Sequence, residues 1–176
     1  MRRFVLAVAT VALAIPLVAQ APVPMPESYR QTQLNMLGLQ RRSVLSMADS
    51  MPENLYGDKV TPIQRSFAEQ LIHAAGAIPF VLGTVGVTIN VGQDPAAAAG
   101  SRAALRSFVN AAYDAAEAEL RRETADQRAA IVTVFGNSMP LWQVWDELHQ
   151  HTFWTLGQVV ANFRKHGMAP PGFGFF

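Results

Sequence analysis

The last quarter of the chain constrains the fold more than any other segment. Between Met139 and His166, apolar residues return every three to four positions, which is the period of an α-helix that buries one face. Gly167 and the pair Pro170-Pro171 then end the helix. Its buried stripe is predicted to be Leu141, Trp145, Leu148, Thr152, Val159 and Phe163. A long helix with one apolar stripe has to pack against other helices.

Three further segments show the same helical period: Ser28–Met51, Thr61–Leu82 and Arg102–Arg122. Ser101 is the predicted N-cap of the third segment. The solvent-facing side of that helix is predicted to hold Glu117, Glu119, Arg121 and Arg122.

The second of these helices has a clear predicted start. Thr61 is a good N-cap, Pro62 fits the first helical position, and Gln64 completes a capping box. The stripe of this helix is predicted to be Ile63, Phe67, Gln70, Ala74 and Val81. Because the helix is apolar almost all round after Gln70, we expect a central or covered position.

The connections are long. Pro52–Val60 is predicted to be a loop, and Thr84–Val91 an extended loop or a frayed helix end. Asp94-Pro95 indicates either a helix start or a low-complexity linker. Ile131–Phe135 is expected to fold over the bundle end before a turn at Gly136-Asn137. Four helical patterns without a convincing strand pair predict an all-α protein, a single four-helix bundle with long inter-helix loops.

The N-terminal segment is typical of a signal peptide. Arg2 and Arg3 precede an apolar run, and Ala19-Gln20-Ala21 offers small residues for cleavage after Ala21 or after Ala19. The run is short for a membrane span, which needs about 20 apolar residues, although an uncleaved anchor is the alternative. We therefore expect residues 1–21 to be a leader, residues 22–176 to be the bundle domain, and the protein to be periplasmic or extracellular.

Charge and cysteine content exclude several classes of partner. The chain has 14 basic and 13 acidic side chains; without Arg2 and Arg3, 12 basic ones remain, a net charge of −1. No clustered basic patch is left for nucleic acid, and no membrane contact is expected beyond the leader. The absence of cysteine excludes disulfides, cysteine-ligated zinc and a thiol nucleophile on this chain.

Two histidines lie beside the predicted stripes. We call the positions at either edge of a buried stripe its shoulders. On the last helix, His151 lies on one shoulder together with Thr155 and Gln158, and His149 lies on the other shoulder. On the second helix, His73 has a similar position. Helix shoulders face each other across the groove where bundles place metal and ligand sites. We expect His73 and His151 to meet there, although spacing alone also fits two surface or hydrogen-bonded histidines.

Several short motifs accompany these histidines. His73 ends the phrase Ser66–His73, and His151 is followed by Gly157-Gln158, Arg164, Gly167 and Pro170-Pro171. With these motifs, nearly all of residues 22–176 resembles the DinB-like family of four-helix-bundle proteins. The resemblance implies that His73 and His151 correspond to two of the three histidines that bind a divalent metal in many members.

The chain departs from the family pattern at the third histidine, where it has Thr155. A hydroxyl is a poorer ligand than imidazole, so the affinity for zinc, nickel or iron is expected to fall. Three alternatives remain. In the first, the groove binds no metal but a different ligand. In the second, a weak metal site persists, with Thr155 or water in the third position. In the third, a carboxylate from Glu69 or Glu147 replaces the missing imidazole, since Glu69 precedes His73 and Glu147 precedes His151 by one helical turn.

The resemblance implies a metal-dependent transferase or isomerase that uses a low-molecular-weight thiol. The missing histidine, and the scarcity of such thiols outside the cytosol, favour a non-catalytic bundle instead. That bundle would hold a small apolar ligand, as a monomer or a homodimer; the tail Phe173–Phe176 is typical of a covered surface. His149 is expected to be packed or partly exposed, and His166 to be a helix C-terminal cation. The core or interface aromatics are predicted to be Trp142, Trp145 and Trp154.

Overall fold

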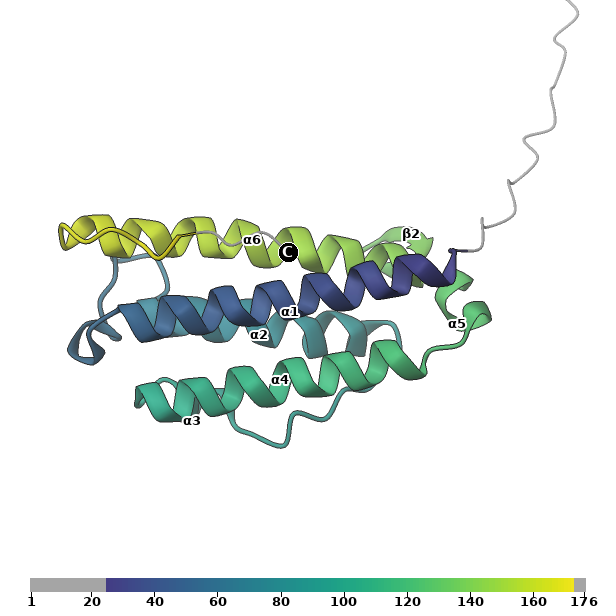
Figure 1. Ribbon diagram of the computed structural model, residues 1–176, viewed down its shortest axis with the longest axis horizontal. Helices are drawn as coiled ribbons and strands as arrows, with labels where there is room; N and C mark the ends of the chain where they lie inside the picture. Colours follow the sequence, from purple (N-terminus) through teal and green to yellow (C-terminus); the bar gives the residue numbers. More distant parts are fainter. Residues whose placement is uncertain (1–24, 173–176) are drawn as a thin grey trace, which may run out of the picture.

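The computed structural model describes residues 25–172, so the predicted leader (residues 1–21) and the Phe173–Phe176 tail lie outside the described residues. Four long helices lie side by side along the long axis of the molecule (Figure 1): α1 (Glu27–Ser50), α2 (Phe67–Thr84), α4 (Arg102–Arg122) and α6 (Leu141–Lys165). Three short elements join them: η1 (Glu53–Leu55), α3 (Pro95–Ala98) and α5 (Ala125–Ala129). The predicted helical bundle is confirmed.

The four long helices enclose one apolar core. Helices α1 and α2 each pack against both α4 and α6, so the bundle has a four-cornered cross-section. The predicted stripe of α6 is buried, with Trp145 fully enclosed and its indole N–H donating to the Glu123 carboxylate at 3.0 Å. Two details differ from expectation. Glu119 is buried rather than solvent-facing and pairs with Arg122 on its own helix, and Trp154 is exposed.

The start of α2 differs from the sequence prediction. Thr61 begins a turn that closes at Gln64, and the helix begins at Phe67 with Ser66 as its N-cap and Glu69 completing the capping box. Backbone carbonyls of the preceding loop accept the N–H groups of Phe67 and Ala68, which anchors the chain at this point. Ile63, which was expected in the core, is therefore 99% exposed.

The segment before α6 contains a strand pair that was not expected. Strands β1 (Ile131–Val134) and β2 (Asn137–Pro140) form an antiparallel hairpin. The turn residues Phe135 and Gly136 both have positive φ, +48° and +86°, as tight two-residue hairpin turns require. Val134 is buried against the bundle, so the expectation that this segment folds over the bundle end is confirmed.

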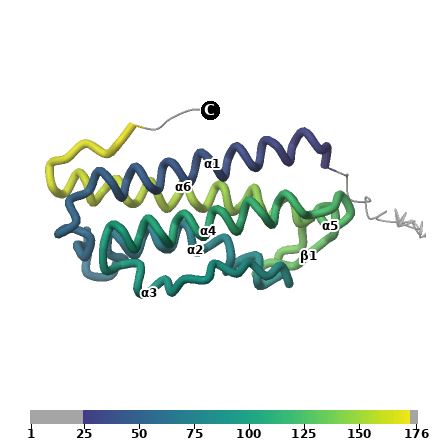
Figure 2. Tube along the Cα trace, turned by 60° about the horizontal axis from the view of Figure 1, so that its bottom comes forward, coloured from purple at the N-terminus to yellow at the C-terminus, as the bar shows by residue number. Residues whose placement is uncertain are grey.

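The other boundaries follow the predicted signals. Asp94 and Ser101 cap α3 and α4 through their side chains, and residues after Thr84 form an irregular segment. Gly167, at φ +68°, follows the end of α6, and the chain then folds back along the bundle (Figure 2). Within residues 25–172, no helix is both long and apolar enough to cross a membrane.

The two competing capping boxes provide a test of where α2 begins. Replacing Ser66 with alanine should lower the free energy of unfolding by about 1 kcal/mol, because the Glu69 N–H loses its acceptor. The matched change Thr61→Ala should stay within about 0.5 kcal/mol of the parent. Urea denaturation of the three proteins measures both effects; the reverse order would place the helix start at Thr61.

Candidate functional site

The structure brings together the two histidines singled out in the sequence. His73 of α2 and His151 of α6 face each other with their Nε2 atoms 3.1 Å apart. Their ring centroids are 4.9 Å apart and the rings meet edge to face, at 76°. The expectation that these imidazoles converge between the two helices is therefore confirmed.

Both imidazoles are held in the neutral form. Partial burial lowers the pKa of His73 to about 4, with further contributions from the positive charge of Arg65 and from His151. Burial, followed by Arg65, also lowers the pKa of His151. A neutral imidazole offers a nitrogen lone pair to a metal ion or to a hydrogen-bond donor, which a protonated ring does not.

Helices α2 and α6 run antiparallel at this point. One turn before His73, Gln70 donates its side-chain N–H to Gln158 at 3.1 Å, and Gln158 lies two turns after His151. Thr155 lies between these two contacts along α6 and is buried, with 2% of its surface exposed. The polar positions predicted on the shoulder of the last helix therefore follow one seam between the helices.

Neither candidate glutamate joins the imidazole pair. The carboxylate of Glu69 accepts the Ser66 backbone N–H at 2.7 Å, and this bond lowers the pKa of Glu69. Glu147 is exposed and borders a hollow beside His151. Over residues 25–172, no three histidine, aspartate or glutamate side chains are grouped so that they could hold a metal ion.

Two hollows flank the imidazole pair. An open hollow of about 610 Å³ with polar and apolar walls lies beside His73, and the exposed side chains of Lys59 and Arg65 line it. A smaller, mostly apolar cavity of about 280 Å³ lies beside His151, between α2, α6 and the β1–β2 hairpin. Arg65 could not be singled out from the sequence, because its place near His73 depends on the loop that precedes α2.

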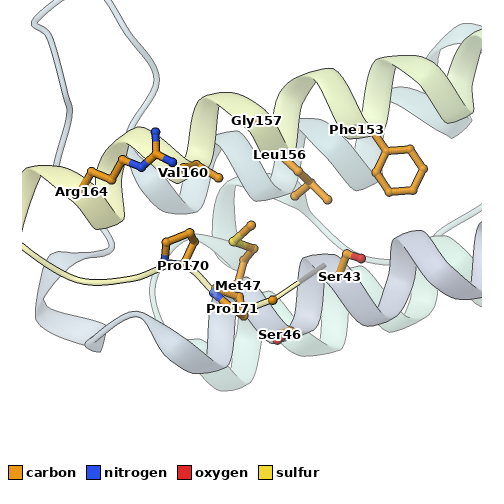
Figure 3. A pocket seen from close by; sticks show the side chains of 11 residues that line it. Ser43, Ser46, Met47, Phe153, Leu156, Gly157, Val160, Arg164, Pro170 and Pro171 are labelled. Carbon is orange, nitrogen blue, oxygen red and sulfur yellow. The ribbon is translucent and has the colours of Figure 1, made fainter. Parts of the chain in front are cut away.

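A third hollow lies on the other side of α6 (Figure 3). This groove, of about 420 Å³, runs between α1 and α6, and the returning segment with Pro170 and Pro171 borders it. Phe153 and Gly157 line it, and both positions lie more than a quarter of a turn around α6 from His151. Several motif residues that follow His151 therefore line this groove and not the site of the imidazole pair: Gly157, Arg164, Pro170 and Pro171.

The imidazole pair fits part of a metal site. Two nitrogens bound to one tetrahedral zinc ion at about 2.0–2.1 Å would be about 3.3 Å apart, close to the 3.1 Å between His73 and His151. However, the Nδ1 atom of His151 is buried without a hydrogen-bond partner. Ligating histidines almost always donate this second N–H to an acceptor. The residues present therefore fit a weakly held ion rather than a tightly bound one.

The remaining histidines lie elsewhere. His149 is buried between helices, and neither ring nitrogen has a hydrogen-bond partner; burial lowers its pKa to about 4. His166, at the C-terminal end of α6, contacts the Asp58 carboxylate at 2.7 Å, together with Lys165. These bonds lower the pKa of Asp58.

The fold and the seam define a helical bundle that holds a half-buried pair of neutral imidazoles between two antiparallel helices. No protein-family model and no curated protein matches the chain. Among solved structures, the crystal structure of a DinB-like protein from Bacillus cereus ATCC 10987, at 2.01 Å resolution, is similar with a TM-score of 0.70. The identity is 20%, over 81% of this chain and 95% of that chain. The chain therefore has the DinB-like fold, as the sequence motifs implied.

Burial of neutral His149 should make the protein sensitive to acid. Its pKa is about 4 in the folded state and about 6.5 when unfolded, so the stability present above pH 6.5 is lost as the pH falls toward 4. Between pH 7.5 and pH 4.5, protonation of the unfolded chain at His149 should lower the free energy of unfolding by about 2–3 kcal/mol. Urea unfolding at pH 7.5 and pH 4.5 should show a smaller acid loss for His149→Phe than for the parent. The control His166→Gln should retain the parent's loss, and an equal loss in all three proteins would contradict the argument.

Proposed function

We propose that this protein binds a divalent transition-metal ion, weakly and reversibly, between His73 and His151. The observation that carries the proposal is the convergence of two neutral imidazole nitrogens at 3.1 Å in a polar seam of the bundle. Neutral imidazole is a good ligand for zinc, nickel and iron. When bound, such an ion supplies a Lewis acid that attracts and polarises an anionic or carbonyl oxygen.

Three features support weak binding. Among residues 25–172, only two side chains that could bind a metal converge here, and the nearby position that a third histidine would take is filled by Thr155. The guanidinium of Arg65 lies close enough to lower the pKa of both rings, so its positive charge also opposes a cation. His151 in addition lacks an acceptor for its Nδ1–H. Each feature reduces the affinity relative to a site with three oriented imidazoles.

We place the function at ligand binding rather than at the thiol transfer or isomerisation that the family resemblance implies. Two protein ligands leave at least two coordination positions open on a four-coordinate ion. The apolar hollow beside His151 favours a ligand that has an apolar part. The predicted leader at residues 1–21 supports placing this binding function in the periplasm or outside the cell.

Metal titration tests the proposal directly. The protein, stripped of metal with a chelator, should bind about one equivalent of Co²⁺ or Zn²⁺ in calorimetry. His73→Ala and His151→Ala should each weaken that binding by tenfold or more, since one of two ligands is removed. The matched control His166→Ala removes an imidazole at the far end of α6 and should bind as the parent does. Parent-like binding by the His151→Ala protein would contradict the proposal.

Restoring the third imidazole provides a test in the opposite direction. Thr155→His places a histidine one helical turn after His151 and should tighten Co²⁺ binding by about tenfold or more. Because Thr155 is buried, the larger side chain should also cost about 1–3 kcal/mol of stability. Thr155→Leu is the control for size: it should show a similar cost without tighter binding.

A further inference from the structure

The cavity beside His73 carries an uncompensated positive charge. Its charged lining residues are Lys59, Arg65 and Glu69, which together give a net charge of +1. Over residues 25–172, neither cation has an ion-pair partner within 4.0 Å, whereas one Glu69 oxygen is engaged by the Ser66 backbone. A hollow of this size with a net charge of +1 favours an anionic ligand.

Arg65 is the cation that links this cavity to the imidazole pair. Its charge acts on His73 and on His151, and also on Glu69. Both rings are neutral, so they do not offset the charge of the guanidinium. A planar guanidinium with no protein acceptor is well suited to hold a carboxylate through two parallel hydrogen bonds.

The same cavity also has apolar walls. Ile63 is 99% exposed at the cavity, and Ile72 lines it from α2. Three small residues in and next to α3 also line it: Pro95, Ala96 and Ala99. One exposed isoleucine alone has no special meaning. Beside an unpaired guanidinium, however, these side chains offer contact for the apolar body of an anion.

We propose that this cavity binds a small organic monocarboxylate with an apolar body, and that Arg65 holds the carboxylate. The net charge of +1 matches a monoanion better than a phosphate dianion. If a metal ion is bound between His73 and His151, the same carboxylate would be its third ligand, at the place where Thr155 offers no good ligand. This step rests on the function proposed above. Arg65 thereby becomes the residue that determines the ligand class.

Calorimetry with benzoate as the probe tests this site. The parent protein should bind benzoate, and Co²⁺ should tighten that binding. Arg65→Gln should weaken benzoate binding about tenfold, which corresponds to the loss of one charge-assisted contact. The matched control Arg42→Gln removes an exposed cation on α1 and should bind benzoate as the parent does. Benzamide, with the same ring but no charge, should bind neither parent nor variant measurably.

The Arg65→Gln protein also separates a specific effect from misfolding. It should bind Co²⁺ alone as tightly as the parent or more tightly, because a repelling charge has been removed. Weaker benzoate binding together with undiminished Co²⁺ binding supports the proposal, since a misfolded variant would lose both.

The remaining outcomes distinguish this proposal from the metal proposal. Equal benzoate affinity in the parent and in Arg65→Gln, with Co²⁺ bound normally, overturns the carboxylate site and leaves the metal site standing. Arg65-dependent benzoate binding without any Co²⁺ binding supports the carboxylate site and overturns the metal site. Tighter binding of phenyl phosphate than of benzoate overturns the assignment to monocarboxylates.

Discussion

The packing of α2 against α6 is the constraint on which the rest of the structure depends. Near one end of this seam, Phe67 packs edge to face on Phe163, with ring centroids 5.8 Å apart. From that contact, His73 lies six residues further along α2, whereas His151 lies twelve residues back along α6. The two imidazoles nevertheless meet between the helices, with their Nε2 atoms 3.1 Å apart. The aromatic contact and the imidazole pair thus belong to one seam, and the packing of that seam brings the two rings together.

Polar side chains in such a seam have to satisfy one another. Gln70 and Gln158 do so through an amide hydrogen bond, and the two imidazoles do so through their Nε2 atoms. Partial burial keeps both rings neutral, and the positive charge of Arg65 acts in the same direction. The charge that makes the rings available as ligands therefore also opposes a bound cation. An anionic ligand beside Arg65 would relieve this conflict.

The helices and the histidine shoulders could be predicted because periodicity is a local property of the sequence. The start of α2 could not, since Thr61 with Gln64 and Ser66 with Glu69 both have the capping-box spacing. Carbonyl groups of the preceding loop decide between them, and the sequence pattern does not show that contact. The hairpin at Ile131–Pro140 was missed because four-residue strands leave too short a pattern. Arg65 could not be found, because its role depends on where α2 begins.

The surroundings of His151 limit the metal site independently of Thr155. Without metal, one ring must donate its Nε2–H to the other. If His151 is the donor, its buried Nδ1 is an unpaired acceptor; if it is the acceptor, its Nδ1 carries a proton and lacks any acceptor. An unpaired buried donor or acceptor costs about 1–3 kcal/mol, so either tautomer leaves the Nδ1 of His151 unsatisfied. Binding an ion through Nε2 forces the proton of His151 onto Nδ1, where it has no acceptor. That cost would persist even with a third imidazole, so replacing Thr155 alone does not make a fully oriented metal site.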